Sequence, residues 1–157
     1  VPCLWFDKEG EEAARFYVAI FPNSQLGAIT RYGKEGFEIH GRPEGSVMTV
    51  TFHLNGQQYT ALNGGPMFEF NEAISLQVQC ADQAEVDRYW NALSAHPENE
   101  ECGWLKDRFG LSWQIVPTRL SELLADPDHA KAKRAMDAML TMKKIDIAAI
   151  ERAAASG

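Results

Sequence analysis

The sequence has few cysteines, and none of them are closely paired. Only three occur among the 157 residues, and no two have the short spacing of a zinc knuckle or a redox motif. This excludes a disulfide framework as the basis of the fold. Cys3 and Cys80 lie in apolar runs and are predicted to be buried thiols. Cys102 follows Glu100 and Glu101, whose carboxylates should raise its thiol pKa and weaken it as a nucleophile.

Long apolar runs and clustered positive charge are also missing. No apolar run approaches the ~20 residues of a membrane-spanning helix, and the N-terminus does not resemble a signal peptide. The net charge is −7, and the basic clusters are limited to residues 131–134 and 143–144. Nucleic-acid binding needs a clustered positive field. We therefore expect a cytoplasmic protein with no nucleic-acid or membrane partner, and, because Val1 is not preceded by Met, a few residues ahead of it.

The composition that remains is that of a globular domain. Hydrophobic residues make up 45% and charged residues 24% of the chain. A similar pattern occurs twice, about half the chain apart. Arg15-Phe16-Tyr17 and Arg88-Tyr89-Trp90 each lie on a helical stretch, and residues 56–62 align with residues 110–116, aromatic on aromatic. Such a repeat indicates duplication of one supersecondary unit.

Hydrophobic periodicity and turn residues predict the elements of both halves. Asn55-Gly56 is a strong hairpin signal, while Asp82, Asp126 and Asp146 are predicted helix caps. In the first half we expect strands at 2–6, 26–32, 46–54 and 57–62, a helix at 11–21 and a glycine-rich loop at 33–45. In the second half we expect a strand at 73–80, a helix from 83, strands within 102–116, and helices at 118–124, from 126 to 143, and after 146.

These elements predict a single α+β domain over residues 1–157. It would contain two βαβββ modules, 1–66 and 72–117, forming curved mixed sheets around a groove, and a helical tail at 118–157. Each strand has one apolar face that a helix can cover and one polar face. We expect the polar faces to curl toward the shared groove.

The predicted groove is lined mainly by neutral polar side chains, with Trp104 as a possible stacking wall. Two interpretations are open: the polar groups satisfy one another and bound water, or they bind a polar small molecule. His53 is either a rim residue or a base suited to proton transfer. The predicted groove residues are Thr49, Thr51, His53, Thr60, Ser75, Gln77, Trp104 and Gln114.

Paired modules of this kind, with the segment from Lys106 to Gln114, resemble the vicinal oxygen chelate superfamily of glyoxalases, extradiol dioxygenases and bleomycin- and fosfomycin-resistance proteins. The chain is most similar to the PhnB-like branch, labelled 3-demethylubiquinone-9 3-methyltransferase, and the resemblance covers residues 1 to about 120. The stretches that carry it are residues 4–7, 12–17, 61–66, 102–105 and 113–117, with part of the tail at 136–149.

Metal-using members of that superfamily hold one divalent ion with His, Glu or Gln side chains from both modules. The resemblance implies that the corresponding positions here are Gln114, Thr60, a position near Ala73 and the first strand, which has no such side chain. A neutral amide is a weak ligand for a divalent ion. We therefore expect neither a metal nor another cofactor.

A methyltransferase would need a crevice for S-adenosylmethionine, usually a glycine-rich turn between a strand and a helix. The candidate turn, residues 63–66, is followed by a connector and a strand. The sequence therefore favours a metal-independent small-molecule-binding protein. The alternative is an enzyme of the same superfamily, metal-dependent or using His53. The resemblance also implies a homodimer.

Overall fold

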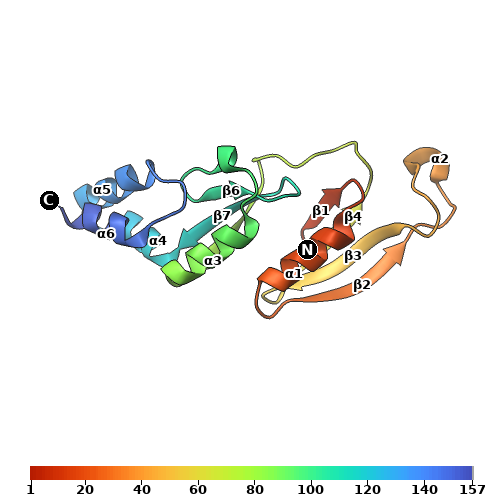
Figure 1. Ribbon diagram of the computed structural model, residues 1–157, viewed down its shortest axis with the longest axis horizontal. Helices are drawn as coiled ribbons and strands as arrows, with labels where there is room; N and C mark the ends of the chain where they lie inside the picture. The colour runs from red at the N-terminus through yellow and green to blue at the C-terminus, as the bar shows by residue number, and fades with distance from the viewer. Residues whose placement is uncertain (157) are drawn as a thin grey trace. The chain divides into compact units, whose positions relative to one another are not determined.

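The structure is a computed structural model that describes residues 1–156 and has a mixed α+β architecture, as predicted (Figure 1). The chain divides into two compact units, Val1–Phe70 and the residues from Asn71 onward.

The first unit contains the predicted βαβββ order. Its sheet has the strand order β1-β4-β3-β2, with β1 parallel to β4 and the other neighbours antiparallel. Asn55 and Gly56 join β3 to β4 with φ angles of 48° and 84°, the left-handed pair that a tight hairpin turn needs. The elements are β1 (Cys3–Phe6), α1 (Gly10–Ile20), β2 (Gln25–Arg31), α2 (Phe37–His40), β3 (Val47–Leu54) and β4 (Gln57–Asn63).

Helix α1 covers one face of this sheet. Val50 and Phe52 are fully buried on β3, and Ala13 and Tyr17 are fully buried on α1. The helix begins at Gly10, one residue before the predicted start, and no side chain caps it at Glu9. Instead, the side-chain oxygen of Asn63 accepts a hydrogen bond from the Gly10 N–H at 2.7 Å. A Cβ on residue 10 would lie only 2.7 Å from that oxygen, so glycine permits the close approach.

The second unit has a smaller sheet than predicted. Its strand order is β5-β7-β6, with β5 parallel and β6 antiparallel to β7. The two mixed sheets agree with the predicted fold class, but the second has three strands where four were expected. Residues 94–103 form a short 3-10 helix and one isolated bridge, between Glu101 and Trp104, where the first unit has β2 and a long loop. The elements are β5 (Ser75–Cys80), α3 (Gln83–Leu93), η1 (Pro97–Asn99), β6 (Trp104–Lys106) and β7 (Ser112–Pro117).

The tail forms three helices, α4 (Thr118–Leu124), α5 (His129–Met139) and α6 (Ile147–Ala155). Asp82 and Asp146 cap α3 and α6 as predicted. Asp128, not Asp126, caps α5. Its carboxylate accepts hydrogen bonds from two amides of the first turn, while the Asp126 carboxylate accepts one from the Asp128 amide. No helix among residues 1–156 is both long and apolar enough to cross a membrane.

The tail helices share an apolar core with the end of β7. On α5 the fully buried residue is Ala135, whereas Met136 and Leu140 are 39% and 59% exposed. The side chains of α5 that pack against the cluster besides Ala135 are those of Ala138 and Met139. The buried residues of the cluster are Leu120, Leu123, Ala135, Ile145, Ile150 and Ala154.

Backbone hydrogen bonds tie the segment before α6 to the rest of the second unit. The amides of Cys102 and Gly103 donate to the carbonyls of Met142 and Lys143, both at 2.8 Å. The Gln83 side chain donates to one backbone carbonyl and accepts from one backbone amide of this segment, at Ile145 and Ile147. The tail is thus an integral part of the second unit.

A fully buried carboxylate, Asp107, organises the turn between β6 and β7. One oxygen accepts hydrogen bonds from the amides of Phe109 and Leu111, at 2.8 and 3.1 Å. The other accepts from the indole N–H of Trp113 at 2.8 Å. This network fixes the register of the two strands.

We expect Asp107→Asn to lower the free energy of unfolding by about 1–3 kcal/mol. The NH2 group of the new side chain would face either the indole N–H of Trp113 or the two backbone N–H groups, and two donors cannot hydrogen-bond to each other. Urea denaturation followed by tryptophan fluorescence measures the effect. Asp137→Asn, the same change at an exposed helical site paired with Lys133, is the control and should stay within about 0.5 kcal/mol of the wild type. Equal effects at both sites would contradict a structural role for the Asp107 network.

Candidate functional site

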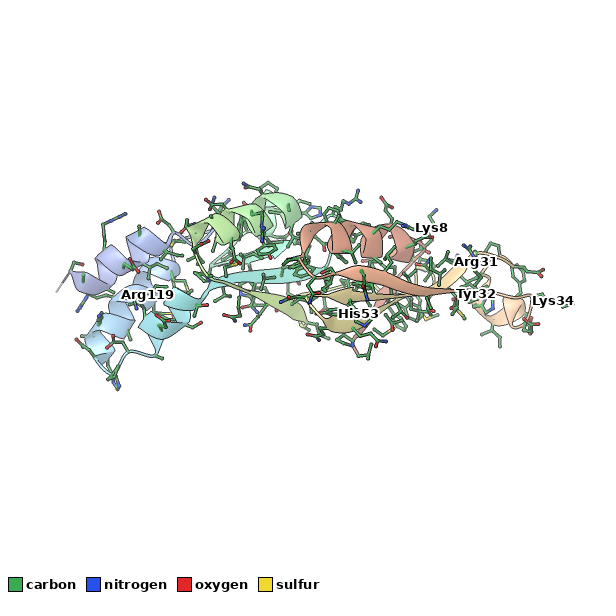
Figure 2. The ribbon with its side chains drawn as sticks, turned by 90° about the horizontal axis from the view of Figure 1, so that it is seen from below. Lys8, Arg31, Tyr32, Lys34, His53 and Arg119 are labelled. Carbon is green, nitrogen blue, oxygen red and sulfur yellow. The ribbon has the colours of Figure 1, made fainter. Side chains whose placement is uncertain are left out.

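Four predicted site residues share one face of the first sheet. The strand register pairs Thr51 with Thr60, and it places Thr49 and His53 two residues to either side of Thr51 on β3. Figure 2 shows His53 on the side of the sheet away from α1. We call this surface the first polar face.

The hydrogen bonds on the first polar face are incomplete. The hydroxyls of Thr49 and Thr30 lie 2.6 Å apart, but those of Thr51 and Thr60 bond to no residue that the structure describes. The Nδ1 atom of His53 is buried and also has no partner among those residues. A buried polar atom without a partner costs about 1–3 kcal/mol. A group that reached this nitrogen would therefore be favoured.

Two further side chains of this face, those of Cys3 and Trp5, were not predicted from the sequence. Cys3 pairs directly with Thr60, so its thiol lies on the polar face and is exposed, and the prediction that it is buried is wrong. Trp5 lies two residues further along β1, and its indole donates to the Gly65 carbonyl at 2.9 Å. The alternation of β1 could have predicted this, because Leu4 and Phe6 face the core and Cys3 and Trp5 must then point to the other face.

The second sheet presents a matching polar face. Gln77, Gln114 and Trp104 lie side by side on β5, β7 and β6. The Gln114 amide donates to the Ser75 hydroxyl at 2.8 Å, and its carbonyl accepts a long bond of 3.4 Å from Gln77. We call this surface the second polar face; here the neutral side chains bond to one another. That the two polar faces form one groove stays a prediction.

Trp104 lies at the edge of an acidic pocket. The pocket has a volume of about 470 Å³, and besides Trp104 its lining consists of Glu72, Glu98, Asn99, Glu101 and Cys102. Glu72 binds Lys106, and this hydrogen bond lowers the pKa of the Glu72 carboxyl. Two further carboxylates remain, so the surroundings of Trp104 are negative, not neutral as the sequence suggested.

The other two thiols are shielded. Burial, with the Glu85 carboxylate adding to it, raises the pKa of the Cys80 thiol to about 12. Burial also raises the pKa of the Cys102 thiol, and the neighbouring Glu101 carboxylate adds to this effect. Cys102 is therefore a poor nucleophile, as its sequence neighbours predicted.

Comparison with known proteins identifies the family. The model of the 3-demethylubiquinone-9 3-methyltransferase family matches residues 1–116. The chain belongs to this family. It is the PhnB-like branch of the vicinal oxygen chelate superfamily that the sequence resembles.

Solved structures agree with this assignment. The PhnB protein of Bacillus cereus is 32% identical, and the match covers 75% of this chain and 98% of that protein with a TM-score of 0.62. A Pseudomonas aeruginosa protein at 20% identity shares the fold, with coverage of 74% and 94% and a TM-score of 0.54. No match was found among curated protein sequences.

The PhnB-like chain does not fit the divalent ion used by other members of the superfamily. Both ends of the Gln114 amide are engaged by Ser75 and Gln77. The counterpart position, Thr60, offers only a hydroxyl, which is a weak ligand for a divalent ion. Among residues 1–156, no group of three His, Cys, Asp or Glu side chains is arranged as a metal site.

The glycine-rich turn of this PhnB-like protein also lacks the form that S-adenosylmethionine usually requires. β4 ends at Asn63, and the described chain then continues through turns to β5 without a helix. The helix N-terminus that receives a dinucleotide-like ligand is therefore missing after this turn. This turn therefore does not support the methyltransferase activity that the family's description names.

We expect iodoacetamide to modify Cys3 first, Cys102 more slowly and Cys80 only after unfolding. Cys3 is exposed, whereas burial raises the pKa of the other two thiols. Peptide mass spectrometry over a time course at pH 8 gives the order, and the urea-unfolded protein, in which all three should react at similar rates, is the control. Native Cys80 reacting as fast as Cys3 would contradict the burial described above.

Proposed function

We propose that this protein binds a small molecule at its polar strand faces and does so without a metal. The single observation that carries the proposal is the row formed by Cys3, Thr60 and Thr51, next to the unpartnered ring nitrogen of His53. Hydroxyls that the fold leaves unused are available to a polar ligand. The poor fit to a divalent ion supports the metal-independent part of the proposal.

The acidic pocket beside Trp104 narrows the choice of ligand. Its carboxylates repel an anion, and the indole ring can stack on a flat neutral group or contact a cation. A neutral or positively charged polar molecule therefore suits the second polar face better than an acid does.

An enzyme that uses His53 as a base is the second candidate. The observation in its favour is again the unpartnered Nδ1, since a ring nitrogen free of protein hydrogen bonds can accept a proton from a bound substrate. Both roles place His53 beside the bound molecule, but only the catalytic role requires turnover.

We also propose that the protein is a homodimer. The exposed side chains of Met136 and Leu140 on α5 support a contact between subunits, because methionine-rich apolar surfaces often serve as interfaces. A cytoplasmic location stays a prediction of the sequence.

We expect neutral and basic polar metabolites and antibiotics, screened by thermal shift, to include a compound that stabilises the protein equally well with and without EDTA. Thr51→Val and Thr60→Val keep the side-chain shape but remove the hydroxyl, so each should weaken binding of that compound by about tenfold, the equivalent of one hydrogen bond of ~1.4 kcal/mol. Thr141→Val, the same change in the tail, is the control and should have no effect.

The same screen separates the two candidate functions. If the wild-type protein converts the bound compound, and His53→Gln still binds the compound but does not convert it, the protein is an enzyme. Binding that is lost in EDTA, or that is the same in Thr51→Val, Thr60→Val and wild type, would contradict the proposed site.

We expect Met136→Glu combined with Leu140→Glu to convert the dimer into a monomer, because two buried charges would oppose the contact. Light scattering after size exclusion measures the mass. Lys133→Glu, an added negative charge at an exposed position on the same helix, is the control and should leave the dimer intact. A monomeric wild-type protein would rule out the homodimer.

A further inference from the structure

A second pocket lies in the first unit, on the other side of its sheet from the first polar face. Its volume is about 300 Å³, enough for one small molecule. Asn63 contributes from the end of β4, where it pairs with the core residue Phe6 and therefore faces α1. Lys8, at the N-terminal end of α1, is labelled in Figure 2. The pocket is lined by Lys8, Glu11, Arg42, Pro43, Ser46, Val47 and Asn63.

Arg42 is the central cation of this pocket, and the fold uses only part of its hydrogen-bonding capacity. Its Nη1 donates to the Asp7 carbonyl at 3.0 Å and to the Asp7 carboxylate at 3.3 Å. Its Nε is buried without a partner, and its Nη2 has no bond to any residue between 1 and 156. The edge formed by Nε and Nη2 is one that grips a carboxylate or phosphate with two parallel hydrogen bonds.

The loop around Arg42 is rigidly held. The Arg42 amide donates to Nδ1 of His40 at 2.9 Å, so the other ring nitrogen carries the proton that the Glu35 carbonyl accepts. The His40 ring also packs on Tyr32, whose hydroxyl donates to the Asn63 carbonyl at 2.6 Å. These contacts hold the backbone at Arg42 in place and leave the guanidinium to adjust to a ligand.

The charged side chains that line the pocket are two cations and one carboxylate, although the whole chain carries −7. The Lys8 ammonium forms no ion pair with any described residue. Glu11, the one acid in the lining, is paired with Arg15 at 2.8 Å. The contact of Arg42 with Asp7 is longer than the roughly 2.7–2.9 Å of a strong charge-assisted bond, so it does not saturate the guanidinium.

We propose that this pocket binds a compact oxyanion, a phosphate or a carboxylate group, and that it is distinct from the polar strand faces. Nη2 of Arg42 meets one oxygen, and a small turn of the guanidinium brings Nε to a second. Lys8 adds a flexible positive charge, and the first turn of α1 adds its dipole. Binding gives the buried Nε–H of Arg42 a hydrogen-bond acceptor, and this stabilises the complex.

The test is a titration of the full ¹⁵N-labelled chain with inorganic phosphate, and separately with acetate, at constant ionic strength. We expect saturable amide shifts at residues 8–11, 42, 44–47 and 63. If phosphate binds more tightly than acetate, the preferred group is a phosphate; if acetate binds more tightly, it is a carboxylate. Arg42→Met should weaken binding at least tenfold while leaving the unfolding midpoint without ligand close to wild type, since it also removes the unpartnered N–H.

Two further variants complete the test. Lys8→Met should weaken anion binding by a smaller factor than Arg42→Met. It tests the pocket even if Arg42→Met fails to fold. Lys34→Met, an exposed lysine of the same unit outside the pocket, is the matched control and should bind like wild type. Shifts that do not saturate, that are unchanged in both pocket variants, or that fall equally in Lys34→Met would overturn the proposal.

Discussion

In each unit, the helix packed on the sheet covers only one face, and this constraint creates the candidate site. α1 takes the apolar side chains of the first sheet, and the buried side chains of α3 lie with the apolar face of the second. Successive side chains of a strand point to opposite faces of the sheet, so a helix that covers one face leaves the side chains of the other face uncovered by that helix. Thr51 and Thr60 are therefore neighbours on the first polar face because Val50 and Ala61 are neighbours in the core.

The sequence predicted elements well where local signals were strong. The alternation of β3, the Asn55-Gly56 turn and the Asp82 cap all have counterparts in the structure. Other predictions failed where tertiary contacts decide. Cys3 is exposed, not buried, because β1 pairs with β4, far away in the sequence, and this pairing places the thiol on the polar face. The missing strand of the second sheet reflects a short connection, which the resemblance between the two halves concealed.

The site was predictable to the extent that it depends on alternation. Gln77, Gln114 and Trp104 come together because neighbouring strands align them. The acidic character around Trp104 was not predictable, because Glu98 and Glu101 arrive from a loop whose path has no sequence signal. Arg42 was missed for the same reason. It lies in a glycine-rich loop, and only the contacts of His40 and Tyr32 show that this loop has a defined shape.

The hydrogen bonds from Cys102 and Gly103 to Met142 and Lys143 have a consequence for protein synthesis. The first unit is complete once its last strand has left the ribosome, and it can fold while the rest is still being translated. The second unit cannot finish until residues 142 and 143 are made, because the amides just before β6 donate to their carbonyls. A chain stopped before residue 142 would therefore carry a folded front half and a second sheet whose Cys102 and Gly103 amides lack their acceptors.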